Sequence, residues 1–109
     1  MNGDIQNLIR KFKELLLQEF GSRVHKVLLF GSYASGTYGA FSDIDVAVVL
    51  EGPMHWKTEQ QIFDLAFDAE EDSGKLLSVT VLSREEFEER PIDSILLIEN
   101  ITELGITVE

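Results

Sequence analysis

The first twenty residues carry apolar side chains at steps of three and four. The apolar positions are Ile5, Leu8, Ile9, Phe12, Leu15, Leu16 and Phe20. This spacing places them on one stripe of a helix. The pattern therefore predicts a helix from about Asp4 to Phe20, closed by Gly21.

Two nearly continuous apolar runs follow, and each is too short for a helix. The first spans Val24 to Phe30, and the second, IDVAVVL, spans Ile44 to Leu50 and ends at Gly52-Pro53. Short apolar runs bounded by turn residues are typical of buried strands. The segment between them, Ser32 to Ser42, is rich in Gly, Ser and Tyr and predicts one short helix or turn.

A second amphipathic helix is predicted from about Trp56 to Asp72, before Ser73-Gly74. Its apolar set consists of Ile62, Phe63, Leu65, Ala66 and Phe67. Leu76 to Leu82 then predicts a third strand.

The last part of the chain carries signals for two more helical segments. Ser83 followed by Glu86 is a capping box, which predicts a helical turn from Arg84 to about Glu89. Pro91 opens a helix over residues 92–104, and residues 106–108 form a short last strand. The order of elements predicts an α/β or α+β fold, a small mixed β-sheet flanked by helices.

Length and composition indicate one domain covering residues 1–109. The chain has 44% hydrophobic residues, enough for a core, and no cysteine, which excludes disulfides, thiolate zinc sites and a cysteine nucleophile. Its N-terminus mixes charged with apolar residues, unlike a signal peptide, and no apolar run reaches the roughly 18 residues of a membrane span. The expected location is the cytoplasm.

The charge balance narrows the class of partner. Twenty acidic against nine basic residues give a formal net charge of −11. This surplus disfavours a nucleic acid partner, because binding to phosphate backbones depends on Lys and Arg. The surplus of negative charge suits a basic protein partner, or it serves only to keep the domain soluble. It does not exclude a homo-oligomer.

Two aspartates at the start of the second strand are the main candidates for chemistry. Asp43 and Asp45 stand at positions i and i+2, so both side chains point to the same face of the sheet. Neighbouring carboxylates repel each other unless a cation neutralises them, and Mg²⁺ is the usual ion where a triphosphate is held. The alternative is that Asp43 ends a loop and Asp45 is an exposed strand residue.

Gly31 and Ser32 follow the first strand directly. Such a turn presents backbone N–H groups and one hydroxyl to a terminal phosphate, although Gly-Ser is also an ordinary turn. Ten residues separate it from the Asp43-Ile44-Asp45 triplet, with an apolar strand on each side. The combination predicts a nucleotide and metal site.

This arrangement resembles the minimal nucleotidyltransferases of the polymerase-beta-like superfamily, whose signature is Gly-Ser, ten residues, then Asp-x-Asp. The resemblance covers most of the chain, up to the tail LIENITELGITVE. It implies a two-metal site in which Gly31 and Ser32 bind the nucleotide and Asp43 and Asp45 are catalytic Mg²⁺ ligands. The implied reaction transfers NMP from an NTP, with ATP expected, to a hydroxyl of a protein or small molecule. Such proteins are often paired with a HEPN-type helical toxin, for which the transferase is the antitoxin.

One departure from the family pattern leaves a second function open. Active members usually carry a third carboxylate on the following strand, where this chain has Ser78 or Thr80. Loss of that ligand weakens a second metal site, and Asp68 or Asp72 is a candidate surrogate. The alternative function is a weakened or inactive nucleotide-binding subunit that acts by binding its partner.

Overall fold

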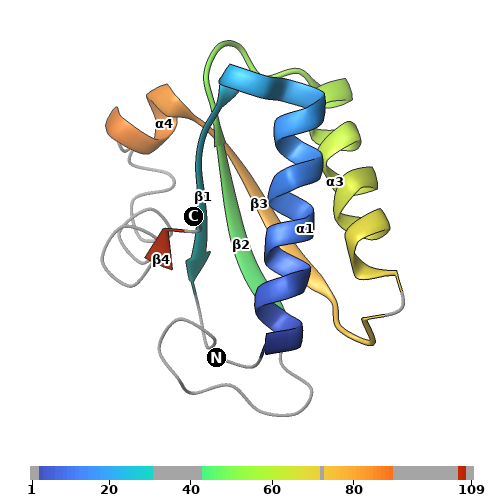
Figure 1. Ribbon diagram of the computed structural model, residues 1–109. Helices are drawn as coiled ribbons and strands as arrows, with labels where there is room; N and C mark the ends of the chain where they lie inside the picture. Colours follow the sequence, from blue (N-terminus) through green and yellow to red (C-terminus); the bar gives the residue numbers. More distant parts are fainter. Residues whose placement is uncertain (1–2, 31–42, 72, 90–105, 108–109) are drawn as a thin grey trace.

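The computed structural model describes residues 3–30, 43–71, 73–89 and 106–107 (Figure 1). The elements in chain order are α1 (Gly3–Phe20), the short 3₁₀ helix η1 (Gly21–Arg23), β1 (Val24–Phe30), β2 (Ile44–Leu50), α3 (Trp56–Glu70), β3 (Leu77–Ser83), α4 (Arg84–Glu89) and β4 (Ile106–Thr107).

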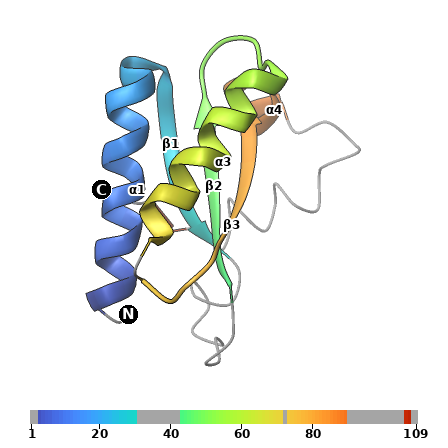
Figure 2. The ribbon, with the colours of Figure 1, turned by 90° about the vertical axis from the view of Figure 1, so that its right-hand side faces the viewer.

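The strands form one mixed sheet in the order β3-β2-β1-β4. β1 is antiparallel to both β2 and β4, whereas β2 and β3 are parallel. α1 and α3 lie side by side on one face of this sheet, and α4 lies toward the other face (Figures 1 and 2). The predicted class, a small mixed sheet flanked by helices, is confirmed.

The main core lies between the sheet and the pair α1 and α3. The apolar stripe of α1 supplies Phe12 and Leu16, both fully buried. From β2, every second residue joins this core, beginning with Ile44 and Val46. Gly21, with φ 55°, ends α1 in the left-handed conformation that favours glycine.

A smaller core lies on the other face of the sheet. It consists of Leu28, Phe30, Ala47, Val49, Leu82 and Phe87. Because Phe87 of α4 covers this face, the alternate residues of β2 are buried as well, which explains the continuous apolar run IDVAVVL.

The apolar set predicted for α3 is partly wrong. The buried residues of α3 are Thr58, Ile62, Ala66 and Ala69. By contrast, Phe63 is 43% exposed and Phe67 is 74% exposed. The helix therefore has a second apolar stripe, which faces outward.

Most element boundaries agree with the prediction within two residues. α3 ends at Glu70 rather than Asp72, and β3 begins one residue late, at Leu77. The capping box is confirmed: the Glu86 N–H donates to Ser83 Oγ at 3.0 Å, and the Ser83 N–H donates to Glu86 Oε1 at 3.2 Å. The predicted turn or helix in 32–42 and the helix at 92–104 lie outside the described residues. Within the described ranges, no helix combines the length and the apolar character needed to cross a membrane.

Candidate functional site

The candidate site lies where β2 begins. Asp43 immediately precedes β2, which begins at Ile44 as predicted, and Asp45 is the second strand residue. Ile44, between them, is fully buried in the core under α1 and α3. Since side chains alternate along extended chain, both aspartates belong to the opposite face, the face toward which α4 lies.

Asp45 occupies a half-buried position on the inner strand β2. Its backbone pairs with Phe30 of β1 on one side and with Ser78 of β3 on the other. Burial raises the pKa of the Asp45 carboxyl, and the negative charge of Asp43 raises it further, while a hydrogen bond from Ser78 acts in the opposite direction. The two carboxylates thus repel each other at a site where water screens them incompletely.

The strand register decides between the two candidates for the third-ligand position. Ser78 is the direct partner of Asp45, whereas Thr80 is paired with Ala47, one row further from the strand start. Ser78 therefore occupies the place at which a third carboxylate would meet Asp45. Among the residues that the structure describes, no group of three His, Cys, Asp or Glu side chains is arranged to hold a metal ion.

The other predicted site residues contribute less to the described geometry. Gly31 and Ser32 lie outside the described residues, as does Asp72. Asp68 is an exposed residue of α3, which packs on the face opposite to the aspartates. The structure does not bring Asp68 to the site, so its prediction as a surrogate ligand is wrong.

The donor set fits one hard divalent cation. Two carboxylates on one face offer the oxygen ligands that such ions prefer, and a cation would offset the repulsion that raises the Asp45 pKa. Ser78 adds a neutral hydroxyl, which is a weaker ligand than a carboxylate. A second cation would therefore find no third carboxylate beside Asp45 among the described residues.

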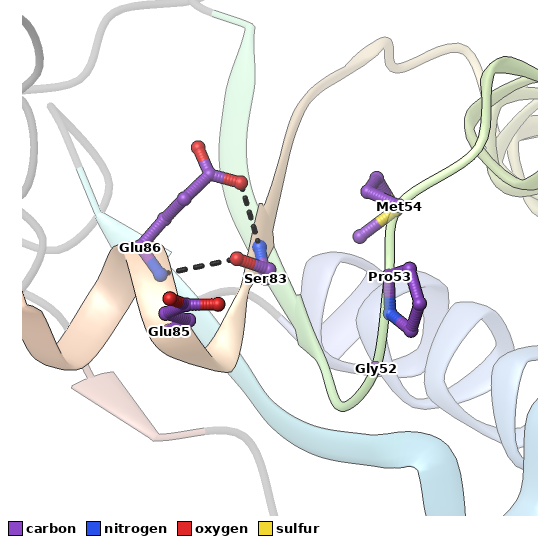
Figure 3. Close-up of a pocket in the computed structure, with 6 residues that line it drawn as sticks. All are labelled: Gly52, Pro53, Met54, Ser83, Glu85 and Glu86. Carbon is purple, nitrogen blue, oxygen red and sulfur yellow. Dashed lines mark hydrogen bonds between the residues drawn. The ribbon is translucent and has the colours of Figure 1, made fainter.

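A pocket of about 370 Å³ lies at the other end of β2 and β3 (Figure 3). Its walls are Gly52, Pro53, Met54, Ser83, Glu85 and Glu86. The strands run parallel, so this pocket follows their last residues, while the aspartates stand at the first residues. Its two glutamates would repel phosphate, and the pocket is not a candidate nucleotide site.

Contacts that the sequence did not predict hold the start of β3 against β2. The Ile44 N–H donates to the Leu76 carbonyl at 2.9 Å. The Leu77 N–H donates to Glu70 Oε1 at 2.6 Å, so a carboxylate of α3 fixes the first residue of β3. The partners lie up to 32 residues apart in the chain, and no local pattern indicated them.

The model of the nucleotidyltransferase domain family matches residues 9–103. Three curated relatives come from Methanocaldococcus jannaschii, and all are named as candidate protein adenylyltransferases. MJ0141 is 33% identical over 63 residues, which cover 58% of this chain and 64% of the relative. MJ0604 is 41% identical over 40% of this chain and 44% of the relative, and MJ1305 is 38% identical over 41% and 31%. The chain thus spans less than two thirds of the length of these relatives.

Two solved structures share the fold. A crystal structure of a toxin-antitoxin with AMP-PNP superposes with a TM-score of 0.62 at 22% identity, covering 92% of this chain and 71% of that chain. A candidate nucleotidyltransferase from Sulfolobus solfataricus gives a TM-score of 0.51 at 20% identity, covering 98% and 86%. With the family model matching most of its length, the chain belongs to the nucleotidyltransferase domain family.

Proposed function

We propose that this domain is a metal-dependent nucleotidyltransferase that moves AMP from ATP to a hydroxyl group of a partner protein in the cytoplasm. The observation that carries the proposal is the pair Asp43 and Asp45 on one face at the start of an inner strand, in a chain of the nucleotidyltransferase family. The names of the Methanocaldococcus relatives support a protein acceptor, and the neighbour with AMP-PNP, an ATP analogue, supports ATP.

Each residue of the candidate site would have a separate role in the reaction. Asp43 and Asp45 would hold Mg²⁺, which when bound polarises phosphoryl oxygens and offsets their charge. Ser78, the direct strand partner of Asp45, would favour the ionised form of its carboxylate. Gly31 and Ser32 would contribute N–H groups and a hydroxyl to the triphosphate. No Lys or Arg stands between Lys26 and Lys57, so this segment offers no cationic side chain to the phosphates.

The toxin-antitoxin neighbour supports a more specific role. In that role the acceptor is a HEPN-type toxin, and nucleotidylation by this domain silences it. A domain this small holds few surfaces for an acceptor, so the partner would supply part of the acceptor site itself.

One observation favours a second function. Ser78, a neutral residue, faces Asp45 where active relatives are expected to carry a carboxylate. This favours a subunit that binds nucleotide weakly and acts by covering its partner.

The deciding experiment incubates the purified chain with Mg²⁺, labelled ATP and the purified protein encoded beside its gene. The transferase function predicts an AMP adduct on the partner, identified by mass spectrometry. Tight complex formation without an adduct would favour the binding subunit instead.

Two variants make the result specific to the site. Asp45→Asn should abolish transfer, because it removes a ligand while keeping the size of the side chain. Glu19→Gln removes an exposed carboxylate on α1 and should leave transfer unchanged. Equal activity of both variants would contradict the assigned site.

A further inference from the structure

An exposed apolar strip runs along α3 and continues to the residue before β3. We define the α3 apolar strip as Trp56, Phe63, Phe67 and Leu76. The exposed fractions of Trp56, Phe67 and Leu76 are 71%, 74% and 62%. Large apolar side chains gathered on one surface mark an interaction site more often than single ones do.

The three residues of the strip that belong to α3 lie in one row along the helix. Trp56, Phe63 and Phe67 stand at positions i, i+7 and i+11, which repeat on one side of a helix. Over this distance α3 rises about 16 Å. The strip thus offers a row of side chains with the repeat found in the apolar stripe of an amphipathic helix. A second helix of this kind would pack the ridges formed by its side chains into the grooves of this surface.

Acidic residues lie on both sides of the strip. Asp64 and Asp68 follow on the outer side, roughly 100° around the helix axis, and both are exposed. Glu59 and Glu70 lie on the side toward β3, where Glu70 accepts the Leu77 N–H.

Two basic residues also lie at this surface. Lys57 Nζ lies over the Trp56 ring at 5.7 Å from its centre, and Lys75 lines the cavity at Phe67 and Leu76. The acidic residues around the strip outnumber these two lysines, and this balance favours a basic partner.

The strip ends at the same end of β2 and β3 as the candidate site, although α3 covers the opposite face of the sheet (Figure 2). Phe67 and Leu76 line one cavity of about 630 Å³ together with Asp68, Glu70, Glu71, Gly74 and Lys75. The Leu76 carbonyl accepts the N–H of Ile44, the residue between the two aspartates. A partner that extends past this end of the strip would reach the end of the sheet at which Asp43 and Asp45 stand.

We propose that the α3 apolar strip docks a basic amphipathic helix of the protein acceptor. This assignment rests on the proposed function for the identity of the partner as acceptor. Apolar side chains of the partner helix would cover the strip, and Lys or Arg beside them would meet Asp64 and Asp68. A second copy of this chain is a poor occupant, because two identical acidic surfaces repel each other.

Trp56 provides the test, since it is the single tryptophan of the chain. The probe is an 18-residue helical peptide without tryptophan, with leucine on one face and lysine on the other. Docking predicts saturable binding with a shift of the Trp56 emission to shorter wavelength. A peptide with glutamate in place of lysine should not bind.

Matched variants locate the binding surface. Phe67→Ser should weaken peptide binding at least fivefold, and the double change Asp64→Lys with Asp68→Lys about tenfold at low salt. Leu17→Ser and Glu19→Lys, at exposed positions of α1, should bind as the wild type does. Equal affinity of the strip and control variants, or binding of the acidic peptide, would overturn the proposal.

Two further readouts separate this proposal from its alternatives. A concentration-dependent dimer in sedimentation that Phe67→Ser abolishes would assign the strip to a second copy of the chain and overturn the proposal. Peptide binding needs no nucleotide or metal, so Asp45→Asn should bind normally even if transfer is never observed. Where transfer is observed, Phe67→Ser should raise the KM for the protein acceptor and leave kcat unchanged.

Discussion

Asp45 and Ser78 lie directly opposite each other on the parallel strands β2 and β3, and the Ser78 side chain lowers the pKa of the Asp45 carboxyl, which burial and Asp43 raise. This pairing places a neutral donor at the position where the family resemblance implies a third acid. The Ser78 hydroxyl favours the ionised form of Asp45 but adds no negative charge. The site therefore favours one cation over two. Ser78 is the residue that limits how much negative charge the site offers to metal ions.

Replacing Ser78 by aspartate tests this limit. Ser78→Asp should tighten Mg²⁺ binding and raise the transfer rate about tenfold, equivalent to about 1.4 kcal/mol. The added carboxylate supplies an anionic ligand beside Asp45. Metal affinity is measured by calorimetry and the rate by adduct formation.

The control for this change is Ser78→Asn, which has the same shape without the charge. It should bind Mg²⁺ no more tightly than the wild type. If both variants behave alike, charge at this position does not limit the site.

The raised pKa of Asp45 predicts how stability depends on pH. The folded state holds the Asp45 proton more tightly than the unfolded state, whose carboxyl titrates near 3.8. The free energy of unfolding should therefore fall as the pH rises from 3.8 through the higher folded-state pKa. Asp45→Asn removes this loss, so it should be more stable than the wild type at pH 7, with the difference vanishing below pH 3.8.

Thermal melts of both proteins across this pH range provide the measurement. Asp64→Asn controls for the change in net charge. Mg²⁺ should stabilise the wild type more than Asp45→Asn, by about 2.7 kcal/mol at a concentration 100 times its Kd. A wild type that is more stable than Asp45→Asn at pH 7 without metal would contradict the assigned repulsion.

The core under α1 is expected to dominate stability. Phe12 is fully buried, so Phe12→Ala should lower the free energy of unfolding by about 3–5 kcal/mol. Phe67→Ala removes the same side chain from an exposed position and should change it by less than about 0.5 kcal/mol. Urea unfolding compares the two, and a large loss in Phe67→Ala would mean that its ring belongs to the core.

The capping box makes a separate, smaller contribution. Ser83→Ala removes the acceptor of the Glu86 N–H and should cost about 1 kcal/mol in urea unfolding. Ser22→Ala, at an exposed position of η1, is the matched control. Equal losses in the two variants would show that the cap adds nothing.

Local patterns predicted most of the fold. The apolar runs of β1 and β2 and the capping box of α4 matched the structure because each is decided by residues close together in the chain. The exposure of Phe67 was not predictable in this way. Ile62, Ala66 and Ala69 already fill the contact of α3 with the core, and this becomes visible only when α1 and the sheet are in place.

The geometry of the candidate site was predictable to the same extent as the fold. The spacing of Asp43 and Asp45 placed them on one face, since alternation along a strand is a local property. The choice between Ser78 and Thr80 depended on the register between β2 and β3. That register joins residues 33 positions apart, as in the pair Asp45 and Ser78, and the sequence contains no local signal for it.

The position of β2 inside the sheet has a consequence for motion. Hydrogen-bonded strands flank it on both sides, and Val46 and Val48 are fully buried, so their amides should exchange with solvent only when the whole domain unfolds. The six-residue helix α4 opens more easily, because Phe87 is its one buried side chain among those described. Asp45 is therefore fixed to a slowly exchanging inner strand, and local opening at the surface leaves its carboxylate in place.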